Sequence, residues 1–420
     1  MKQPRGTQDF LPPASERFWA LEQLGADIIQ RAGYGRIITP AFEETDLFER
    51  GVGESTDIVN KEMYTFSDRS DNSLTLRPEG TASVMRAIVT HHLWDNGLPI
   101  KLYYDAAMFR YERPQKGRFR QHHQLGIEAV GSEDPALDAE VIELGHTLLR
   151  EARAGDVTLL LNSMGHRGSN CRDRYLPALR AFLEQHRDEL DADCKRRMVQ
   201  NPLRVFDCKV PEDQAILANA PMLSDFICED CRAHLASVEG FLDDAEIKYD
   251  VAPRLVRGFD YYTRTTFEFR SDALDAAQNA VGGGGRYDGL VEEIGGPPLP
   301  GIGFGLGIER ILLAQEAAGG AAAAATLDCY VIPLEQAARS EAVRLTRRMR
   351  EAGLAADVAY VERGLKTQLK HADRTGARFA ALIGEKELAA GRVTMRNMTS
   401  GEQALVGLDE ATAWLAERPR

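Results

Sequence analysis

The chain has 420 residues, of which 44% are hydrophobic and 27% are charged, and its formal net charge is −13. This composition excludes a disordered or fibrous protein, and the length allows two or three domains with substantial cores. The negative charge argues against a general nucleic-acid scavenger, because nonspecific affinity comes from Lys and Arg side chains that neutralise backbone phosphates.

No apolar stretch is long enough to span a bilayer, and the opening residues MKQPRGTQDFLPP lack the apolar region of a secretory signal. We therefore expect a cytoplasmic protein with no membrane partner and with reduced cysteines. Cys228-x-x-Cys231, with Cys194 and Cys208 upstream, has enough thiols for four zinc ligands. Structural zinc sites usually contain two pairs of closely spaced cysteines, and this chain has only one such pair. We therefore interpret the cysteines as plain thiols and predict no metal centre, although the sequence does not decide whether these four cysteines bind zinc.

The first half of the chain alternates between one helical pattern and several strand patterns. Residues 16–31 have the apolar spacing of an amphipathic helix. RIITPAFE, which contains Pro40, predicts an edge strand. The segments MYTFSD, SLTLRPEG, KLYYDAAMFRYERP and HHQLGIEAVG alternate apolar and polar residues, as antiparallel strands do.

A charged, mostly helical segment then interrupts the strands, and residues 174–198 are its clearest helix. Strand patterns return at LVRGFDYYTRTTFEF, followed by GGGGRYDGL, which we interpret as a turn, and by the glycine-lined strand and helix of GIGFGLGIERILL. Residues 319–326 are a candidate linker, and strand alternates with helix beyond it. We predict an α+β catalytic domain built on an antiparallel sheet (residues 1–325), a helical insertion in it (172–240), and a C-terminal α/β domain (326–420).

Two segments are candidates for ligand contacts. Residues 110–120 carry five basic residues and one acidic residue, and the arginine fork can donate two hydrogen bonds to a phosphate. Taken alone, this segment is more simply a solvated basic hairpin. Glycines at 301, 303, 305 and 307 leave one face of a strand bare, which suits a flat ligand or close helix packing. Neither glycine-rich run satisfies GxGxxG or ends as a P-loop does.

Three segments resemble, in order, the signature motifs of the class II aminoacyl-tRNA synthetases: TPAFEETDLF, FRYER continuing to GIEAVG, and GIGFGLGIERIL. LVRGFDYYTRTTFEF and LTLRPEGT resemble the histidine-specific members of that family. The likeness runs through almost the whole chain, including the insertion and the terminal module with LKTQLKHADRTGA.

The resemblance implies that ATP and Mg²⁺ are used to activate L-histidine and that the histidyl group is then passed to histidine tRNA. In this family the histidine carboxylate attacks the α-phosphate of ATP and pyrophosphate leaves. Arg110 and Arg257 match the catalytic arginines that stabilise the phosphate charge, and both would also contact histidine. Arg257 stands where the histidine-specific enzymes use a guanidinium in place of one metal ion of their relatives.

The resemblance also assigns the binding residues. The amino group and imidazole of histidine would meet Glu79, Gly80, Thr81, Gln124, Glu128, Tyr261 and Tyr262, in addition to Arg110 and Arg257. ATP would meet Arg110, Glu112, Phe119, His122 and Arg310. One position departs from the family pattern, because His122 replaces a residue that is often Phe. Either His122 or Phe119 would stack on adenine, and a histidine there can add pH dependence.

For tRNA, Arg113 and Gln115 match residues that meet the extra 5′ guanosine of histidine tRNA. The terminal module resembles an anticodon-binding domain, and its 15 basic and 13 acidic residues from residue 326 onward permit that role. The first motif implies a homodimer.

Two other functions remain. The regulatory subunit of ATP phosphoribosyltransferase is a catalytically silent relative, which would bind histidine without ligating tRNA. Such relatives usually lack FRYERP, LVRGFDYY and the terminal module. A class II synthetase for proline or threonine would share the three motifs but would be expected to differ at RGFDYY and Glu128.

Overall fold

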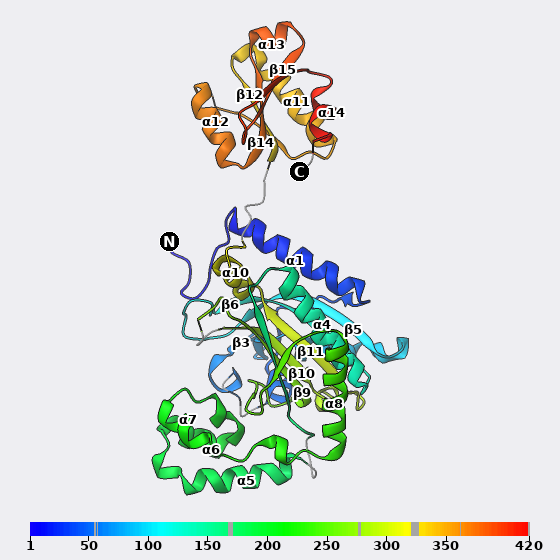
Figure 1. The fold of residues 1–420 in the computed structure, drawn as a ribbon, viewed down its shortest axis with the longest axis vertical. Helices are drawn as coiled ribbons and strands as arrows, with labels where there is room; N and C mark the ends of the chain where they lie inside the picture. Colours follow the sequence, from blue (N-terminus) through cyan, green and yellow to red (C-terminus); the bar gives the residue numbers. More distant parts are fainter. Residues whose placement is uncertain are drawn as a thin grey trace. The chain divides into compact units, whose positions relative to one another are not determined.

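The computed structural model divides the chain into two compact units, Met1–Ala321 and Ala322–Arg420 (Figure 1). It describes residues 1–53, 56, 58–166, 171–275, 279–320, 327–361 and 363–418. The predicted linker therefore lies outside the described residues from residue 321 onward.

A large, mostly antiparallel sheet forms the centre of the first unit. Its order among the described strands is β1-β5-β6-β11-β10-β9-β7-β8, and only the outer pairs β1·β5 and β7·β8 are parallel. The strands are β1 (Gly35–Arg36), β5 (Ile100–Phe109), β6 (Gln121–Val130), β7 (Val157–Ser163), β8 (Tyr249–Val251), β9 (Thr263–Ser271), β10 (Ala280–Arg286) and β11 (Gly301–Gly307). This sheet confirms the predicted fold class.

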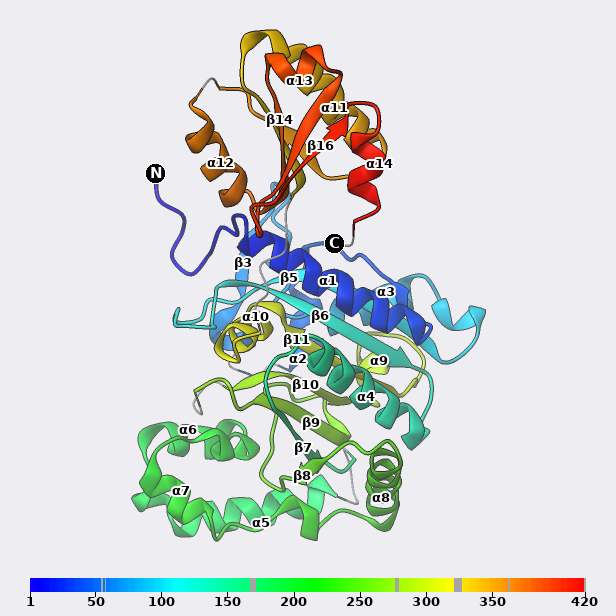
Figure 2. The same cartoon turned by 45° about the horizontal axis from the view of Figure 1, so that its top comes forward.

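Residue alternation on β6 separates the two faces of the sheet. Leu125, Ile127 and Ala129 belong to the apolar core, whereas Gln124 and Glu128 point to the opposite face. The core is covered by the helices α1 (Ala14–Arg31), α4 (Pro135–Glu151), α8 (Glu229–Asp244) and α10 (Ile308–Ala317), as Figure 2 shows. The other face packs a second apolar cluster, which includes Tyr104, Met108 and Val130, around the polar groups of the site.

A smaller sheet, in the order β2-β4-β3, lies beside this second face. It consists of β2 (Phe42–Glu44), β3 (Tyr64–Ser67) and β4 (Ser73–Leu76), and it is flanked by α2 (Thr45–Val52), the turn η1 (Ile58–Glu62), α3 (Thr81–Thr90), the turn η2 (Leu93–Asn96) and α9 (Leu290–Glu293). The edge strand predicted for RIITPAFE is confirmed in part, because β1 lies at the edge of the large sheet. The chain forms β1 and β2 in two different sheets, because Pro40 between them cannot donate a ladder hydrogen bond.

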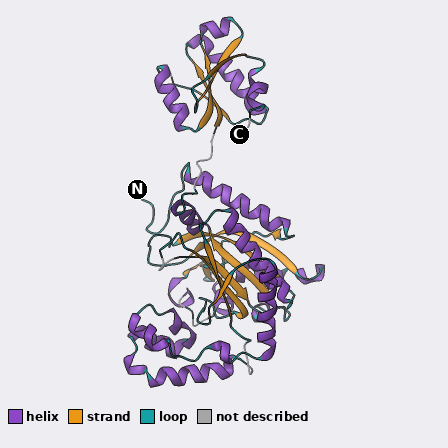
Figure 3. Ribbon diagram, in the orientation of Figure 1, coloured by secondary structure: helices purple, strands orange, loops and turns teal. Residues whose placement is uncertain are grey.

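The insertion is helical, and Figure 3 shows its purple helices grouped beside the orange sheet. Its elements are α5 (Arg172–Gln185), η3 (Arg187–Glu189), α6 (Ala192–Gln200), η4 (Pro202–Asp207), α7 (Pro211–Leu217) and η5 (Leu223–Asp225), before α8 returns to the sheet. The predicted single helix over 174–198 is wrong, because the Asp191 side chain accepts the Cys194 N–H at 2.6 Å and so starts a new helix.

The glycine run is also different from the prediction. Gly282–Gly285 lie inside β10 and are paired on both sides, so they do not form a turn. A Cβ on Gly284 would collide with the Gly303 carbonyl of β11, so the absence of a side chain is what allows these strands to approach.

The second unit has its own core on a mixed sheet in the order β13-β12-β14-β15-β16. Its elements are β12 (Leu327–Pro333), η7 (Gln336–Ala338), α11 (Arg339–Glu351), β13 (Ala356–Val358), α12 (Leu365–Arg374), β14 (Ala377–Ile383), α13 (Glu385–Ala389), β15 (Arg392–Asn397), β16 (Gln403–Gly407) and α14 (Ala411–Ala416). In neither unit does a helix of the described residues have the length and apolar character to cross a membrane.

Candidate active site

A cavity of about 340 Å³ opens on this second face of the large sheet, above β5, β6, β10 and β11. Most of the residues singled out in the sequence line it although they come from segments far apart in the chain. They are Glu79, Thr81, Arg110, Glu112, Phe119, His122, Gln124, Arg257, Tyr261, Tyr262 and Arg310.

Arg110 and Arg257 face this common cavity from different segments. Arg110 follows β5, and its Nε donates to the Pro78 carbonyl at 2.8 Å, which fixes the guanidinium at the cavity wall. Its Cζ lies 5.7 Å from the centroid of the Phe259 ring. Two fixed positive groups are thus available to an anionic ligand in a partly dry site.

Arg257 is held by the sheet. Its Nη1 donates to Glu268 Oε2 on β9 at 2.6 Å. A Cβ on Gly283 would lie 3.1 Å from the Arg257 Cζ, so the glycine strand lets the guanidinium lie close to the backbone. Burial alone would lower the pKa of Arg257, but the Glu268 carboxylate offsets this and raises it. Its buried Nε has no hydrogen-bond partner among the described residues, and so one donor remains for a ligand.

Buried carboxylates mark the opposite part of the cavity. Glu79 accepts the backbone N–H groups of Thr81 at 2.7 Å and Ala82 at 2.8 Å, so it anchors the start of α3. Burial raises the pKa of Glu79. Gln124 of β6 lies close by in the cavity lining. These groups suit a cationic amino group.

Glu128 is 1% exposed and lies below the cavity. It accepts hydrogen bonds from the Thr81 hydroxyl at 2.7 Å and from the Tyr287 hydroxyl. Burial raises the pKa of Glu128 to about 8, although these two hydroxyl bonds act in the opposite direction. Gly80 does not line the cavity, and it packs against the Tyr104 ring instead.

A group of aromatic rings encloses this end. The Phe259 and Tyr261 rings are stacked at 5.1 Å, and the Tyr261 and Tyr262 centroids are 4.8 Å apart. Burial raises the pKa of both tyrosines, which stay neutral. Tyr104 and Tyr287 also line the cavity, although nothing in the sequence patterns pointed to them. Tyr287 follows the glycine run directly, so recognising that run as a strand would have pointed to it.

The other end of the cavity holds the residues assigned to the nucleotide. Arg310 Nε donates to the Gly117 carbonyl at 3.1 Å. Glu112 Oε2 lies 3.5 Å from Arg118 Nη1. Phe119 and His122 both line the cavity. Burial lowers the pKa of His122 to about 3, and the positive charge of Arg110 acts in the same direction as a smaller cause. This imidazole is therefore neutral near pH 7.

Arg113 and Gln115 do not line this cavity. Arg113 borders a neighbouring hollow with Tyr111 and Arg120, and Gln115 pairs with Arg118 in an isolated bridge. Both residues therefore belong to the loop between β5 and β6, beside the cavity mouth.

The four cysteines considered for zinc do not form one site. Cys228 and Cys231 lie with His166 and Cys171, whereas Cys194 and Cys208 lie with two aspartates elsewhere in the insertion. That grouping of cysteines is wrong, because each pair has its own neighbours in a separate group. His166 was not identified from the sequence, although its partner Cys171 follows five residues later.

Comparisons with known proteins identify relatives of both units. Residues 6–311 match the family described as Histidyl-tRNA synthetase, and residues 328–418 match the Anticodon binding domain. A histidine–tRNA ligase of Halothermothrix orenii is 49% identical over 97% of this chain and 97% of its own length. One of Saccharopolyspora erythraea is 49% identical over 99% of this chain and 98% of its own. The crystal structure of apo S. aureus histidyl-tRNA synthetase has a TM-score of 0.82 at 39% identity, covering 99% of this chain and 100% of that one.

Proposed function

The chain belongs to the histidyl-tRNA synthetase family and acts as a histidine–tRNA ligase, and from this premise we propose how its cavity performs the reaction. The family uses ATP. The histidine carboxylate attacks the α-phosphorus, the bond to the pyrophosphate oxygen breaks, and histidyl-adenylate forms. The observation that carries the proposal is that Arg110 and Arg257 face one cavity, where their charges stabilise the oxygens of the transferring phosphate.

Histidine is recognised by the buried end of the cavity. Its ammonium group meets Glu79 and Gln124, with Thr81 beside them, and its imidazole meets Glu128, Tyr261 and Tyr262. A pocket that pairs both ring nitrogens rejects amino acids without them, because the buried polar groups would be left unpaired. This specificity separates the protein from synthetases for proline or threonine.

ATP occupies the opposite end. Glu112 accepts the adenine amino group, Arg310 covers the ring and reaches the γ-phosphate, and Phe119 or His122 stacks on the other face. Mg²⁺ would be bound by the phosphates of ATP, which supply the hard oxygen ligands that it prefers. The carboxylates that line the cavity fit this arrangement, because Glu79 already accepts two backbone N–H groups and Glu309 accepts the His123 N–H.

Histidine tRNA contacts both units. Arg113 and Gln115 beside the cavity mouth meet its 5′ end, and the second unit, which matches the anticodon-binding family, meets the anticodon. The protein works as a cytoplasmic homodimer. Exposed apolar side chains on and near α1 and β1 support a subunit interface, since Trp19 is 60% exposed and Ile38 is 82% exposed.

A pyrophosphate-exchange assay across the amino acids tests the proposed specificity. Exchange should depend on histidine and on both arginines. A regulatory subunit would bind histidine without exchange, but the relatives at 49% identity are ligases over almost the whole chain. Exchange with proline or threonine, and none with histidine, would overturn the assignment of the pocket.

A further inference from the structure

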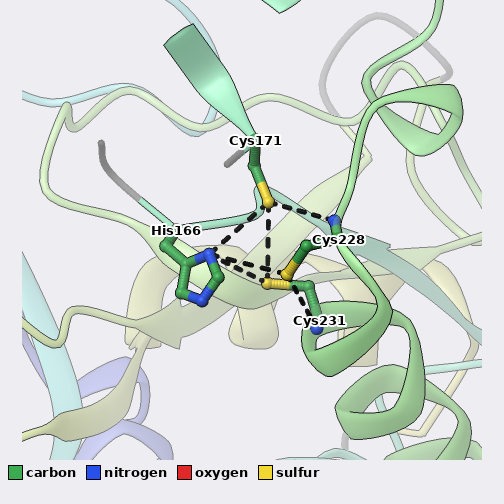
Figure 4. A group of neighbouring side chains, drawn as sticks. All are labelled: His166, Cys171, Cys228 and Cys231. Atoms are coloured by element: carbon green, nitrogen blue, oxygen red, sulfur yellow. Dashed lines mark hydrogen bonds between the residues drawn. The ribbon is translucent and has the colours of Figure 1, made fainter. Parts of the chain in front are cut away.

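Three cysteines and one histidine converge at the base of the insertion (Figure 4). His166 follows β7, Cys171 precedes α5, and Cys228 and Cys231 lie at the start of α8. The imidazole Nδ1 and the three Sγ atoms all lie within 4.8 Å of one another. We propose that these four residues bind one structural zinc ion.

The distances between the four atoms match a tetrahedron around one ion. His166 Nδ1 lies 3.5 Å from Cys171 Sγ, 3.8 Å from Cys228 Sγ and 3.5 Å from Cys231 Sγ. Cys171 Sγ and Cys231 Sγ are 3.9 Å apart. Zinc bonds of about 2.3 Å to sulfur and about 2.05 Å to nitrogen place tetrahedral ligands about 3.8 Å apart for two sulfurs and about 3.6 Å apart for nitrogen and sulfur.

Backbone N–H groups also point to two of the sulfur atoms. The Cys228 N–H points to Cys171 Sγ at 3.2 Å, and the Cys231 N–H points to Cys228 Sγ at 3.4 Å. Such donors stabilise thiolates and orient metal ligands. At Gly165, whose φ is +59°, a Cβ would lie 2.6 Å from the Cys171 Cβ, so glycine allows the histidine loop to pass close to this cysteine.

The types of the four ligands favour zinc over other metals. Three thiolates and one imidazole in a closed tetrahedron are typical of structural zinc sites. A disulfide is a poorer account, because a sulfur–sulfur bond is only about 2.05 Å long and the cysteines are free. An iron–sulfur cluster needs a wider spacing of its thiolates than a single ion does, since the cluster itself stands between them.

The second cluster in the insertion has a different explanation. There the Asp191 side chain caps α6 through the Cys194 N–H, and Asp213 accepts the Asp191 N–H at 3.2 Å and the Cys208 thiol at 3.2 Å. Its acceptors are already occupied by hydrogen bonds within the protein. This cluster therefore provides control cysteines that are also buried in the insertion.

The proposed ion would join the chain where it leaves the catalytic sheet and where it returns. The neighbouring Arg172 donates to the Met164 carbonyl at 3.2 Å and to the Tyr262 carbonyl. Zinc would thus hold the insertion in place and, through Arg172, support the segment that carries the imidazole pocket. It would take no part in the chemistry at phosphorus.

The test measures metal in the full-length chain, purified under reducing conditions without a metal-chelating resin. Elemental mass spectrometry should find about one zinc ion per chain. Cobalt(II) exchanged into the protein should show a thiolate charge-transfer band and the absorption of tetrahedral cobalt. Less than about 0.1 zinc per chain with no cobalt band, or a Cys171–Cys231 disulfide in metal-free protein, would overturn the proposal.

Variants locate the ion. His166→Ala should lower the zinc affinity by roughly tenfold or more, whereas His166→Cys should retain zinc as a four-thiolate site. Cys194→Ser, in the second cluster, and Cys329→Ser, in the other unit, should keep the wild-type zinc content. If His166→Ala does not fold, release of zinc by a mercurial that blocks thiols is compared in wild-type protein and in Cys194→Ser, and equal release from both assigns the ion to thiolates outside the second cluster. Zinc that survives both His166→Ala and mercurial treatment would place the metal elsewhere.

Discussion

Arg257 Nη1 lies 2.6 Å from Glu268 Oε2, and Glu268 Oε1 in turn accepts Arg270 Nε at 2.7 Å. One carboxylate therefore holds two guanidinium groups, of which only that of Arg257 lines the cavity. The pair gives a matched comparison between an arginine placed at the proposed phosphate and an arginine with the same partner outside it.

We expect Arg257→His to lower the rate of histidine-dependent pyrophosphate exchange by about 10²- to 10³-fold, as loss of a transition-state donor does. Histidine binding, measured by calorimetry, should remain detectable. Arg270→His removes the other partner of Glu268 and should change the exchange rate by less than about threefold. Full activity of Arg257→His, or an equal loss in Arg270→His, would contradict the proposed role of Arg257.

The residue that stacks on adenine can be identified by comparing Phe119→Ala with His122→Ala. Loss of a base-stacking ring costs about 1–3 kcal/mol, so one of the two variants should raise the KM for ATP roughly 5- to 100-fold while the KM for histidine changes little. Equal small effects in both variants would show that neither ring stacks.

The pKa of His122 adds a pH test. Because burial and Arg110 hold this pKa at about 3, the imidazole stays neutral between pH 6 and 8. The KM for ATP should therefore show no step from His122 in this range, contrary to the pH dependence expected from the sequence. A step near pH 6.5 that disappears in His122→Phe would show that the imidazole is less shielded than its burial indicates.

Sequence patterns identified the fold class because the strands β5 and β6 and the helix α1 each have one consistent periodicity. Sequence patterns also identified Arg110, Arg257 and Arg310 as candidates, because each lies within a short contiguous motif. Residues that depend on distant partners were missed. Arg286 is fully buried and donates to Asp138 of α4, which also bonds His234 of α8, yet its segment was interpreted as a turn.

Composition cannot show such pairings, because nothing near Arg286 in the sequence indicates which carboxylate will neutralise it. The same limit applied to His166 and Cys171, which are close in sequence but whose other two partners, Cys228 and Cys231, lie about sixty residues further along the chain. Glycine was ambiguous for a related reason. A run of glycines is typical of turns, and only the neighbouring strands reveal that close packing requires it at Gly284.

Glu128 makes the stability of the protein depend on pH. Its pKa rises from 4.5 to about 8 in the folded state, so its favourable contribution is complete below pH 4.5 and is lost as the pH rises through about 8. The free energy of unfolding of Glu128→Gln, relative to that of the wild type, should increase from pH 5 to pH 9 by at most about 4 kcal/mol. Urea unfolding at both pH values measures this difference.

A conservative change at an exposed acidic residue controls for general charge effects in that experiment. Glu246→Gln, on the surface after α8, should leave the pH dependence of the wild type unchanged. If Glu128→Gln follows the wild-type curve within error, the carboxyl group is ionised in the folded protein, and its two hydroxyl bonds outweigh its burial.

Removal of residues 326–420 should separate the two steps of the reaction. The core clusters of the first unit contain only its own residues, and the second unit has cores of its own, so the truncated chain should remain folded. Pyrophosphate exchange does not need tRNA, and we expect its KM values for histidine and ATP to change by less than about threefold. Aminoacylation should fall about 100-fold or more in kcat/KM for tRNA, because contacts worth about 3 kcal/mol are lost. Circular dichroism and thermal unfolding of the truncated chain check that it has folded before either rate is compared. An equal loss in exchange and in aminoacylation by a folded chain would mean that the second unit supports the cavity itself, which is incompatible with a role confined to the anticodon.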